Sequence, residues 1–403
     1  MKSIQVVLLA AGKSTRFKPF SDSNKSHKSM FPVCGKPIIE WTLDGLRKIG
    51  IKNVLIVVDD NDSEIKNFLK GYKKLNLKIA VQKKALGMGN ALLSAVEKLD
   101  DNFMLAFPHF VNEKIFLEAI KKPLAKDMIR VLADTTEEPW KYGIIEFKEG
   151  KPVGIVEKPE KGKEPSKIRI YGCYLLNKEF VNHLANTPPH EYQFETALSS
   201  FMKKGKVEVL MTKLEPLPLK YVWDIFKIKN SVLEKISQYV SKSASIAKTA
   251  VIKGKVVVED GAIISDFAIL EGPVYIGKNA VVGSYCILRN NSVLEEGAQI
   301  ERYTDCARSI VGKNSHIHSG FVGDSIIGEG VRIGANFITA NKRLDRSIVR
   351  TKIDIEMVST GIVAMGAVIG NNSKIGINVS TMPGIVVSND SIIEPGKIIK
   401  KNC

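Results

Sequence analysis

The spacing of hydrophobic residues along the chain changes character near residue 235. In the first part, short apolar runs alternate with segments in which apolar residues recur every three to four positions. The runs Ile4–Leu9, Val54–Val58 and Phe103–Phe107 are continuous, as expected for strands buried on both faces of a sheet. The segments 38–49 and 91–99 have helical spacing instead. This alternation predicts βαβ units, and therefore an α/β domain with a parallel sheet.

From Val258 onward, aliphatic residues recur every six positions. The period covers Val258, Ile264, Leu270, Ile276, Val282, Leu288, Leu294 and Ile300, and after a slip of a few residues it resumes at Val311, Ile317, Ile327 and Ile333. It returns at Val363, Ile369, Ile375, Val387 and Ile393, with Thr381 at the one position that breaks it. A period of six fits neither an α-helix nor a simple alternating strand. It predicts a left-handed parallel β-helix of hexapeptide repeats, and eight consecutive matches argue against an ordinary β-sandwich.

The length of 403 residues also favours more than one domain. We predict an α/β domain over residues 1–235 and a β-helix domain over residues 236–403, with a helix over about Lys229–Tyr239 between them. Because such a prism exposes flat faces, we expect a homotrimer packed side by side through the β-helix.

Composition excludes some classes of protein. No run of 18 apolar residues is present, so we expect no membrane span, and the apolar start of the chain lacks a signal-peptide cleavage site. Five cysteines without paired spacing suggest free thiols in a reducing cytoplasm. The net charge of +16 comes from scattered lysine doublets without a nucleic-acid-binding motif. We therefore expect a basic surface that attracts nucleotides and phosphosugars rather than a nucleic-acid partner.

A glycine-containing loop follows the first predicted strand. The stretch Leu9-Ala10-Ala11-Gly12-Lys13-Ser14-Thr15-Arg16 is followed by His27-Lys28, and small residues there let backbone N–H groups approach a nucleotide. The pattern resembles the signature of sugar-1-phosphate nucleotidylyltransferases. The resemblance implies an α/β Rossmann-like nucleotidyltransferase domain, a nucleotide contact by Leu9, Ala11 and Gly12, and catalytic charges on Arg16 and Lys28. Ser14 and His27 stand where the family prefers Gly and Pro.

Further motifs follow in the family's order, together covering about residues 1–235. The resemblance makes Gln82 the base-reading glutamine, Gly87 part of the Gly-Thr-x-x-Ala loop, Gly143 part of the sugar-side Tyr-Gly, Glu157 and Lys158 contacts to the sugar and its phosphate, and Asp224 a catalytic metal ligand. Met88 and Phe226 replace a Thr and a Gly of the family pattern. The implied substrates are a sugar 1-phosphate and UTP or dTTP.

The expected first metal ligand is the clearest departure. The family places a Gly-Asp after the third strand and uses Mg²⁺, whereas this chain has Pro108-His109. Imidazole suits Mn²⁺, Co²⁺ or Zn²⁺ better than Mg²⁺. Three interpretations are open: His109 and Asp224 hold a different metal, another carboxylate serves, or turnover is lost and the chain is a nucleotide-sugar-binding regulatory paralogue.

The β-helix half carries its own candidate chemistry. Because Ile317 is in the inward register, alternation places His316 and His318 outward, where a histidine can act as a general base. The order His318, Gly323-Asp324, Asn341 and Met382-Pro383-Gly384 resembles the acetyltransferase half of bifunctional N-acetylglucosamine-1-phosphate uridylyltransferase/glucosamine-1-phosphate acetyltransferases, especially archaeal ones.

That resemblance makes His318 the base, Asn341 a substrate contact and acetyl-CoA a co-substrate. Phe321 replaces a Tyr, and Arg350 and Lys352 only approximate the sugar-binding lysines. The β-helix is therefore either an acetyltransferase or only a trimerisation domain.

Overall fold

The computed structural model describes residues 4–21 and 26–403, which form two compact units. The first unit contains residues 4–14, 26–30 and 38–218, and the second contains 15–21, 31–37 and 219–403. Within these described residues, no helix combines the length and the apolar character needed to cross a membrane.

The first unit is built on a nine-stranded mixed sheet. The main order is β11-β7-β10-β6-β1-β4-β5, with β8 paired to β10 and β9 paired to β8. The strands are β1 (Gln5–Ala10), β4 (Asn53–Asp59), β5 (Asn76–Gln82), β6 (Asn102–Ala106), β7 (Ile129–Thr135), β8 (Gly143–Lys148), β9 (Lys151–Glu157), β10 (Ile168–Asn177) and β11 (Val207–Met211). Strands β6, β1, β4 and β5 are parallel, as predicted.

One strand outside the predicted βαβ units departs from the parallel arrangement: β10 runs antiparallel to both β6 and β7. It follows the antiparallel pair β8–β9 without a helix in between. A parallel return needs a long crossover, usually a helix, and the connection to β10 contains none.

Helices cover both faces of this sheet. They are α1 (Ile38–Lys48), α2 (Ser63–Gly71), α3 (Gly87–Leu93), α4 (Lys114–Ile120), α5 (Lys178–Ala185) and α6 (Gln193–Lys203), with 3₁₀ turns η1 (Lys28–Met30), η2 (Val96–Lys98) and η3 (Pro139–Lys141). One core packs α1, α2 and α4 against the sheet, and a second packs α3, α5 and α6. The helix predicted over 38–49 is α1, whereas the one predicted over 91–99 is split into α3 and η2.

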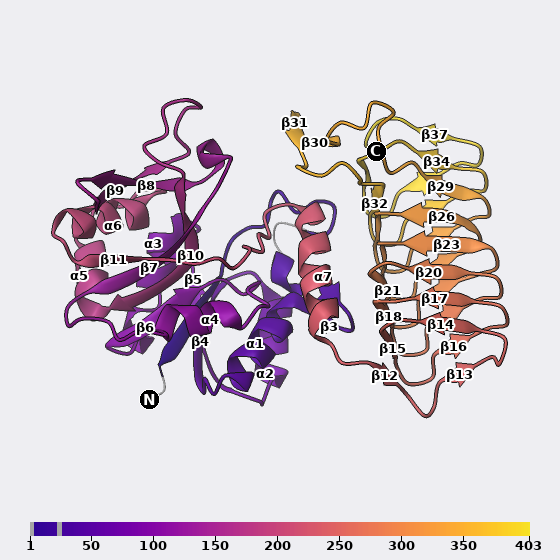
Figure 1. Cartoon of the computed structure of the whole chain (residues 1–403), viewed down its shortest axis with the longest axis horizontal. Coiled ribbons are helices and arrows are strands. Elements are labelled where there is room, and N and C mark those ends of the chain that lie inside the picture. Colours follow the sequence, from indigo (N-terminus) through magenta and orange to yellow (C-terminus); the bar gives the residue numbers. More distant parts are fainter. Residues whose placement is uncertain (1–3, 22–25) are drawn as a thin grey trace. The chain divides into compact units, whose positions relative to one another are not determined.

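The second unit is dominated by a left-handed β-helix with three parallel sheets of eight strands (Figure 1). The first sheet contains β12 (Tyr239–Val240), β15 (Val256–Val258), β18 (Val274–Ile276), β21 (Ser292–Leu294), β24 (Ile310–Val311), β27 (Ile326–Ile327), β32 (Ala367–Ile369) and β35 (Ile385–Val387). The second contains β13 (Ser245–Ile246), β16 (Ile263–Ile264), β19 (Val281–Val282), β22 (Gln299–Ile300), β25 (His316–Ile317), β28 (Arg332–Ile333), β33 (Lys374–Ile375) and β36 (Ile392–Ile393). The third contains β14 (Val251–Lys253), β17 (Ile269–Glu271), β20 (Ile287–Arg289), β23 (Thr304–Ala307), β26 (Gly320–Gly323), β29 (Phe337–Thr339), β34 (Ser380–Thr381) and β37 (Ile398–Ile399).

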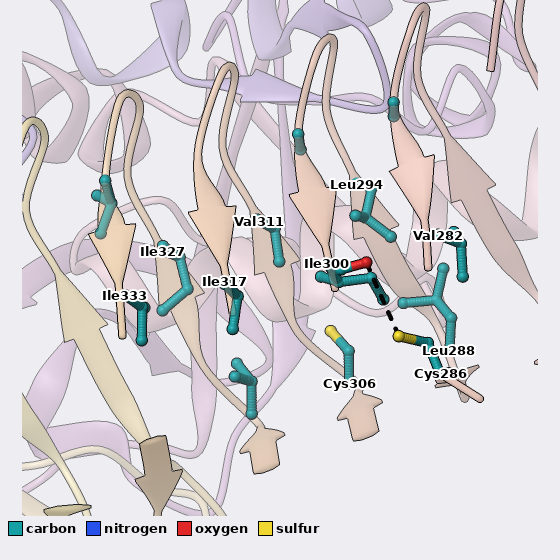
Figure 2. Packing of buried hydrophobic residues seen from close by; sticks show 14 of the residues in the cluster. Val282, Cys286, Leu288, Leu294, Ile300, Cys306, Val311, Ile317, Ile327 and Ile333 are labelled. Carbon is teal, nitrogen blue, oxygen red and sulfur yellow. Dashed lines mark hydrogen bonds between the residues drawn. The ribbon is translucent and has the colours of Figure 1, made fainter. Parts of the chain in front are cut away.

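The predicted inward positions form the core of this prism. All eight residues from Val258 to Ile300 in the six-residue series are at most 1% exposed. Figure 2 shows Ile300, Ile317 and Ile333 in successive rungs, and Cys286 beside Ile300 with its thiol toward the backbone carbonyl, 3.8 Å away. Each rung therefore contributes side chains to the core from all three sheets, and successive rungs stack these side chains in rows.

The slip in the period has a simple geometry. Cys306 continues the series six residues after Ile300, and Val322 lies between Ile317 and Ile327, and both are fully buried. The rungs here are one or two residues shorter than the earlier ones, since Gln299 pairs with His316 and His316 pairs with Arg332. The inward prediction for Val363 was wrong: it is 52% exposed, because residues 340–366 leave the prism and carry the hairpin β30 (Arg350–Ile353) and β31 (Glu356–Ser359). Thr381 keeps the inward register and is buried.

Other segments pack on the β-helix within the second unit. They are β2 (Pro32–Val33), β3 (Lys36–Pro37), η4 (Val222–Asp224) and α7 (Ile225–Lys235). The predicted helix over Lys229–Tyr239 is displaced, because α7 ends at Lys235 and Tyr239 already belongs to β12. The amide of Gly35 donates to Oε2 of the buried Glu295, at 2.8 Å. Lys229 of α7 donates to the Arg308 carbonyl, at 2.7 Å.

Candidate active sites

The carboxyl ends of β1, β4, β5 and β6 meet at one edge of the first unit's sheet. Leu8 is level with Ala106, Ala10 with Val58, and Asp59 with Gln82 in the strand register. The segments that follow these strands are therefore neighbours. Ligands of open α/β sheets bind outside this carboxyl edge.

The loop after β1 has a strained backbone at one position. Leu9 and Ala11 are buried, whereas Gly12 is exposed. Ser14 has a φ of 54°, its hydroxyl donates to the Gly12 carbonyl at 3.3 Å, and it accepts from the Lys28 amide at 3.1 Å. The left-handed φ explains why the family prefers glycine here. In this chain the serine hydroxyl ties the loop to the segment that carries Lys28.

Two buried histidines lie near Lys28. His27 is 5% exposed, and its Nδ1 accepts from the Ser29 amide at 3.2 Å and lies 2.8 Å from the Ser29 hydroxyl. Burial, and then the charge of Lys28, lowers the pKa of His27 to about 3. The imidazole is therefore neutral at neutral pH and works as an acceptor that fixes the turn η1.

His109 completes this cluster from the end of β6. Its ring stacks on Phe107, with centroids 5.6 Å apart, and meets Phe110 edge to face at 5.2 Å. Burial, then the charges of Lys28 and His27, lowers the pKa of His109 well below its usual value. Its Nδ1 is buried without a hydrogen-bond partner. A neutral imidazole with an unused lone pair is a suitable ligand for a borderline metal ion and a poor one for Mg²⁺.

The described residues nevertheless contain no group of three or more His, Cys, Asp or Glu side chains arranged to hold a metal ion. Any ion at His109 would therefore need oxygen atoms from the substrates to complete its shell, as Mg²⁺ commonly does with phosphates.

Gln82 and the start of α3 form a rigid corner at the same edge. The Gln82 amide donates to Asn90 Oδ1 at 2.8 Å and to the Gly87 carbonyl at 3.4 Å. Gly87 has a φ of +87°, and a Cβ on it would lie 2.2 Å from the Glu191 carbonyl oxygen. The corner therefore requires glycine at this position and holds the Gln82 side chain in one orientation.

The sugar-side motifs come together on β8 and β9. Gly143 is level with Glu157, and a Cβ on Gly143 would lie 2.3 Å from Glu157 Oε1, so the glycine makes room for this carboxylate. Lys158, with a φ of 46°, donates its amide to the Tyr142 carbonyl at 3.0 Å. Its ammonium donates to the Tyr192 hydroxyl at 3.4 Å.

A carboxyl group that the sequence did not single out lies close by on α6. Burial, with the charges of Glu157 and Glu191 adding to it, raises the pKa of Glu195 to about 7, and its Oε2 is buried without a partner. No motif pointed to it, because its position depends on α6 packing against β9.

Arg16 and Asp224 belong to the second unit, whereas the loop residues up to Ser14 belong to the first. Arg16 is exposed. Asp224 Oδ2 accepts from the amides of Lys220 and Tyr221, at 2.6 and 2.7 Å. This fixes the carboxylate at the start of α7.

The β-helix carries the second candidate site. His318 follows β25 and is 62% exposed, and Ile317 beside it is fully buried, which confirms the predicted outward register. Glu301, one rung earlier, places Oε2 3.3 Å from His318 Nδ1 and Oε1 2.6 Å from His316 Nε2. These two histidines line a cavity of about 490 Å³ with Arg332, Lys374 and the apolar side chains Ile333, Ile375, Ile392, Ile393 and Pro395.

Glu301 was missed from the sequence, although one signal could have found it. Its strand β22 pairs with β25, and the rung offset of Gln299 and His316 puts Glu301 opposite His318. The six-residue spacing alone does not reveal this offset, because the rung is one residue short.

Asn341 follows β29 in a different sheet and does not line the His318 cavity. Its amide donates to Asp324 Oδ2 at 2.5 Å, and Asp324 is held by Arg308 through two bonds of 2.6 and 2.8 Å. Within one chain, His318 and Asn341 are therefore in separate surroundings.

Comparisons with known proteins cover nearly the whole chain. A family model described as nucleotidyl transferase matches residues 5–223, and one described as the GMPPB C-terminal domain matches residues 252–354. A bifunctional protein GlmU of Methanococcus maripaludis is 32% identical over 99% of this chain and 95% of its own length. A bifunctional sugar-1-phosphate nucleotidylyltransferase/acetyltransferase of Sulfurisphaera tokodaii is 29% identical over 99% of this chain and 98% of its own length.

Among solved structures, the UDP-glucose pyrophosphorylase from Acinetobacter baumanii is similar in fold, with a TM-score of 0.50 and 22% identity. The match covers 58% of this chain and 94% of that one.

Proposed function

Because the chain belongs to the nucleotidyl transferase family and is a sugar-1-phosphate nucleotidylyltransferase, we propose that it joins a sugar 1-phosphate to UTP or dTTP at the carboxyl edge of β1, β4, β5 and β6. The observation that carries this proposal is the convergence of the Gly12 loop, Lys28 and Gln82 at that edge.

In the proposed reaction, a phosphate oxygen of the sugar 1-phosphate attacks the α-phosphorus of the nucleotide. A new phosphorus–oxygen bond forms, the bond to the β-phosphate breaks, and pyrophosphate leaves with the electron pair. Lys28, held by the Ser14 hydroxyl through its amide, would balance the charge on the phosphates. Gln82 would hydrogen-bond to the pyrimidine, and Lys158 with Glu157 would bind the sugar phosphate and the sugar.

We propose that a divalent ion bound by His109 assists this step. When bound, such an ion neutralises phosphate charge and orients the attacking oxygen. The neutral imidazole of His109, with its unpartnered Nδ1, favours Mn²⁺ or Co²⁺ over Mg²⁺.

Pyrophosphate release tests the proposal. Wild-type protein would receive UTP, dTTP, ATP or GTP with hexose and amino-hexose 1-phosphates, in separate reactions with Mg²⁺, Mn²⁺ and Co²⁺. We expect release with a pyrimidine nucleotide. We expect a loss of about tenfold or more in Gln82→Ala, since that variant would lack the hydrogen bond that we propose to the base. The exposed Lys84→Ala is the matched control. No pyrophosphate release in any of these reactions would refute the proposed reaction.

A second activity is favoured by the geometry around His318. We propose acetyl transfer from acetyl-CoA to the amino group of an amino-sugar 1-phosphate, with His318 as the base. The amine nitrogen attacks the thioester carbonyl, a carbon–nitrogen bond forms and the carbon–sulfur bond breaks. His318 accepts the amine proton and then returns it to the departing sulfur, so that coenzyme A leaves as the thiol. The carboxylate of Glu301 beside Nδ1 stabilises the imidazolium that forms.

Release of free thiol from acetyl-CoA in the presence of glucosamine 1-phosphate tests this second activity. We expect release by wild type and none by His318→Ala. Equal release by both would refute the assignment of the base. Because Asn341 does not line the His318 cavity of its own chain, we also propose that a homotrimer brings the two residues together between protomers.

A further inference from the structure

His316 and His318 both contact the carboxylate of Glu301. Glu301 Oε1 lies 2.6 Å from His316 Nε2, whereas its Oε2 lies 3.3 Å from His318 Nδ1. On its other side, His316 Nδ1 lies 3.2 Å from NH1 of Arg332. The four side chains come from three successive rungs of one sheet, because β22, β25 and β28 are paired neighbours.

The protons in this row can be assigned from donor and acceptor chemistry. A guanidinium only donates, so His316 Nδ1 must be the acceptor, and its proton is then on Nε2. A carboxylate only accepts, so His316 Nε2–H donates to Glu301 Oε1. The second carboxylate oxygen faces His318 Nδ1 and favours the proton on that nitrogen. Nε2 of His318 is then left with a free lone pair, which is the form that a general base needs.

The side chains of this row differ in how far they are exposed to solvent. The Glu301 side chain is 43% exposed and His318 is 62% exposed, so neither is held by burial. His316 is 27% exposed and makes the shortest contact with Glu301. Lys374 and Glu394 are further charged groups that line the same cavity.

We propose that His316 is a positioning residue for His318, acting through Glu301 and itself oriented by Arg332. The inference rests on the proposed acetyl transfer and goes beyond it, because it assigns the orientation of the base to a second histidine. Without His316, the Glu301 carboxylate is free to rotate. His318 then populates both tautomers, and the tautomer with its proton on Nε2 is unable to accept another proton there.

The test uses full-length protein and two measurements. The first is kcat and KM for acetyl transfer from acetyl-CoA to glucosamine 1-phosphate. For His316→Ala we expect kcat to fall about tenfold with both KM values unchanged, in line with the loss of an outer hydrogen-bond partner. His316→Gln keeps a donor toward Glu301 and an acceptor toward Arg332, so we expect it to restore most of kcat. Gln299→Ala, an exposed change one rung away, is the control.

The second measurement is nitrogen NMR of the imidazole rings at neutral pH, which does not depend on activity. We expect His318 to carry its proton mainly on Nδ1 in wild type and His316→Gln, and to become a mixture in His316→Ala. An unchanged His318 tautomer in His316→Ala would overturn the proposal. If the wild type transfers no acetyl group, the proposed second activity fails, and the tautomers still decide whether His316 orients His318.

Discussion

Glu295 offers a quantitative test of the packing within the second unit. This side chain is 2% exposed. Its Oε2 accepts from the Gly35 amide at 2.8 Å, and its Oε1 is buried without a partner. Burial, with the charge of Glu296 adding to it, raises the pKa of Glu295 from 4.5 to about 7. The folded protein therefore holds this proton at pH values where the unfolded chain has already released it.

The consequence for stability follows from linkage. Since the folded pKa is raised, the contribution of Glu295 is fully present below about pH 4.5 and is lost as the pH rises through about 7. A difference from 4.5 to about 7 corresponds to about 3 kcal/mol at roughly 1.4 kcal/mol per unit. Glu295→Gln does not titrate. The free energy of unfolding of this variant, relative to wild type, should therefore rise by about 3 kcal/mol between pH 4.5 and pH 8.

The assay is urea unfolding of wild type and Glu295→Gln in parallel at pH 4.5, 6, 7 and 8, followed by circular dichroism of the β-sheet signal. The quantity of interest is the change of the difference with pH, because a fixed offset from the new amide cancels. Glu329→Gln removes an exposed carboxylate of the same unit and should leave the pH dependence as in wild type. A difference between Glu295→Gln and wild type that stays constant from pH 4.5 to pH 8 would refute the reasoning.

Three further predictions concern single positions. Ile317→Ala empties a fully buried rung position and should cost about 2–5 kcal/mol in thermal or urea unfolding, whereas Ile263→Ala, at a position 44% exposed, should cost less than about 1 kcal/mol. Gly87→Ala places a Cβ 2.2 Å from a backbone oxygen at a φ of +87° and should reduce pyrophosphate release at least tenfold, unlike Gly71→Ala, which has open space. His109→Asp should raise turnover with Mg²⁺ by about tenfold or more, and no gain in kcat would contradict the metal role of His109.

The sequence was sufficient for features that repeat at a fixed spacing. The aliphatic residues from Val258 to Ile300 were placed inside the prism because a six-residue period has one structural solution. Helix α1 was predicted for a similar reason, since Ile39, Leu43 and Leu46 lie on one face and all are buried.

Features that depend on where the chain turns back could not be predicted in this way. An apolar run does not reveal its direction in a sheet, so β10 was not expected to run antiparallel. Val363 has the correct spacing but lies in an excursion, and spacing contains no information about a loop that leaves the prism.

In the candidate sites, too, local spacing was predictable from the sequence and contacts between distant segments were not. His318 was found because alternation from Ile317 is local, whereas Glu301 and His316 acquire their roles from contacts between rungs. The replacement at His109 was visible in the sequence, but its unpartnered Nδ1 was not. Its lowered pKa was not visible either, because it follows from burial and then from the charges of Lys28 and His27.

The hydrogen bond from Gly35 to Glu295 also bears on how the chain is made. Its two partners are 260 residues apart, and a ribosome adding roughly 5–20 residues per second takes on the order of 10–50 s between them. Throughout that interval the segment with Val33 and Cys34, both buried in the finished protein, has no partner from the β-helix. During synthesis, the apolar segment with Val33 and Cys34 therefore lacks its β-helix contacts until the second half of the chain has been made. In a protein that ends near residue 218, this segment would never gain them.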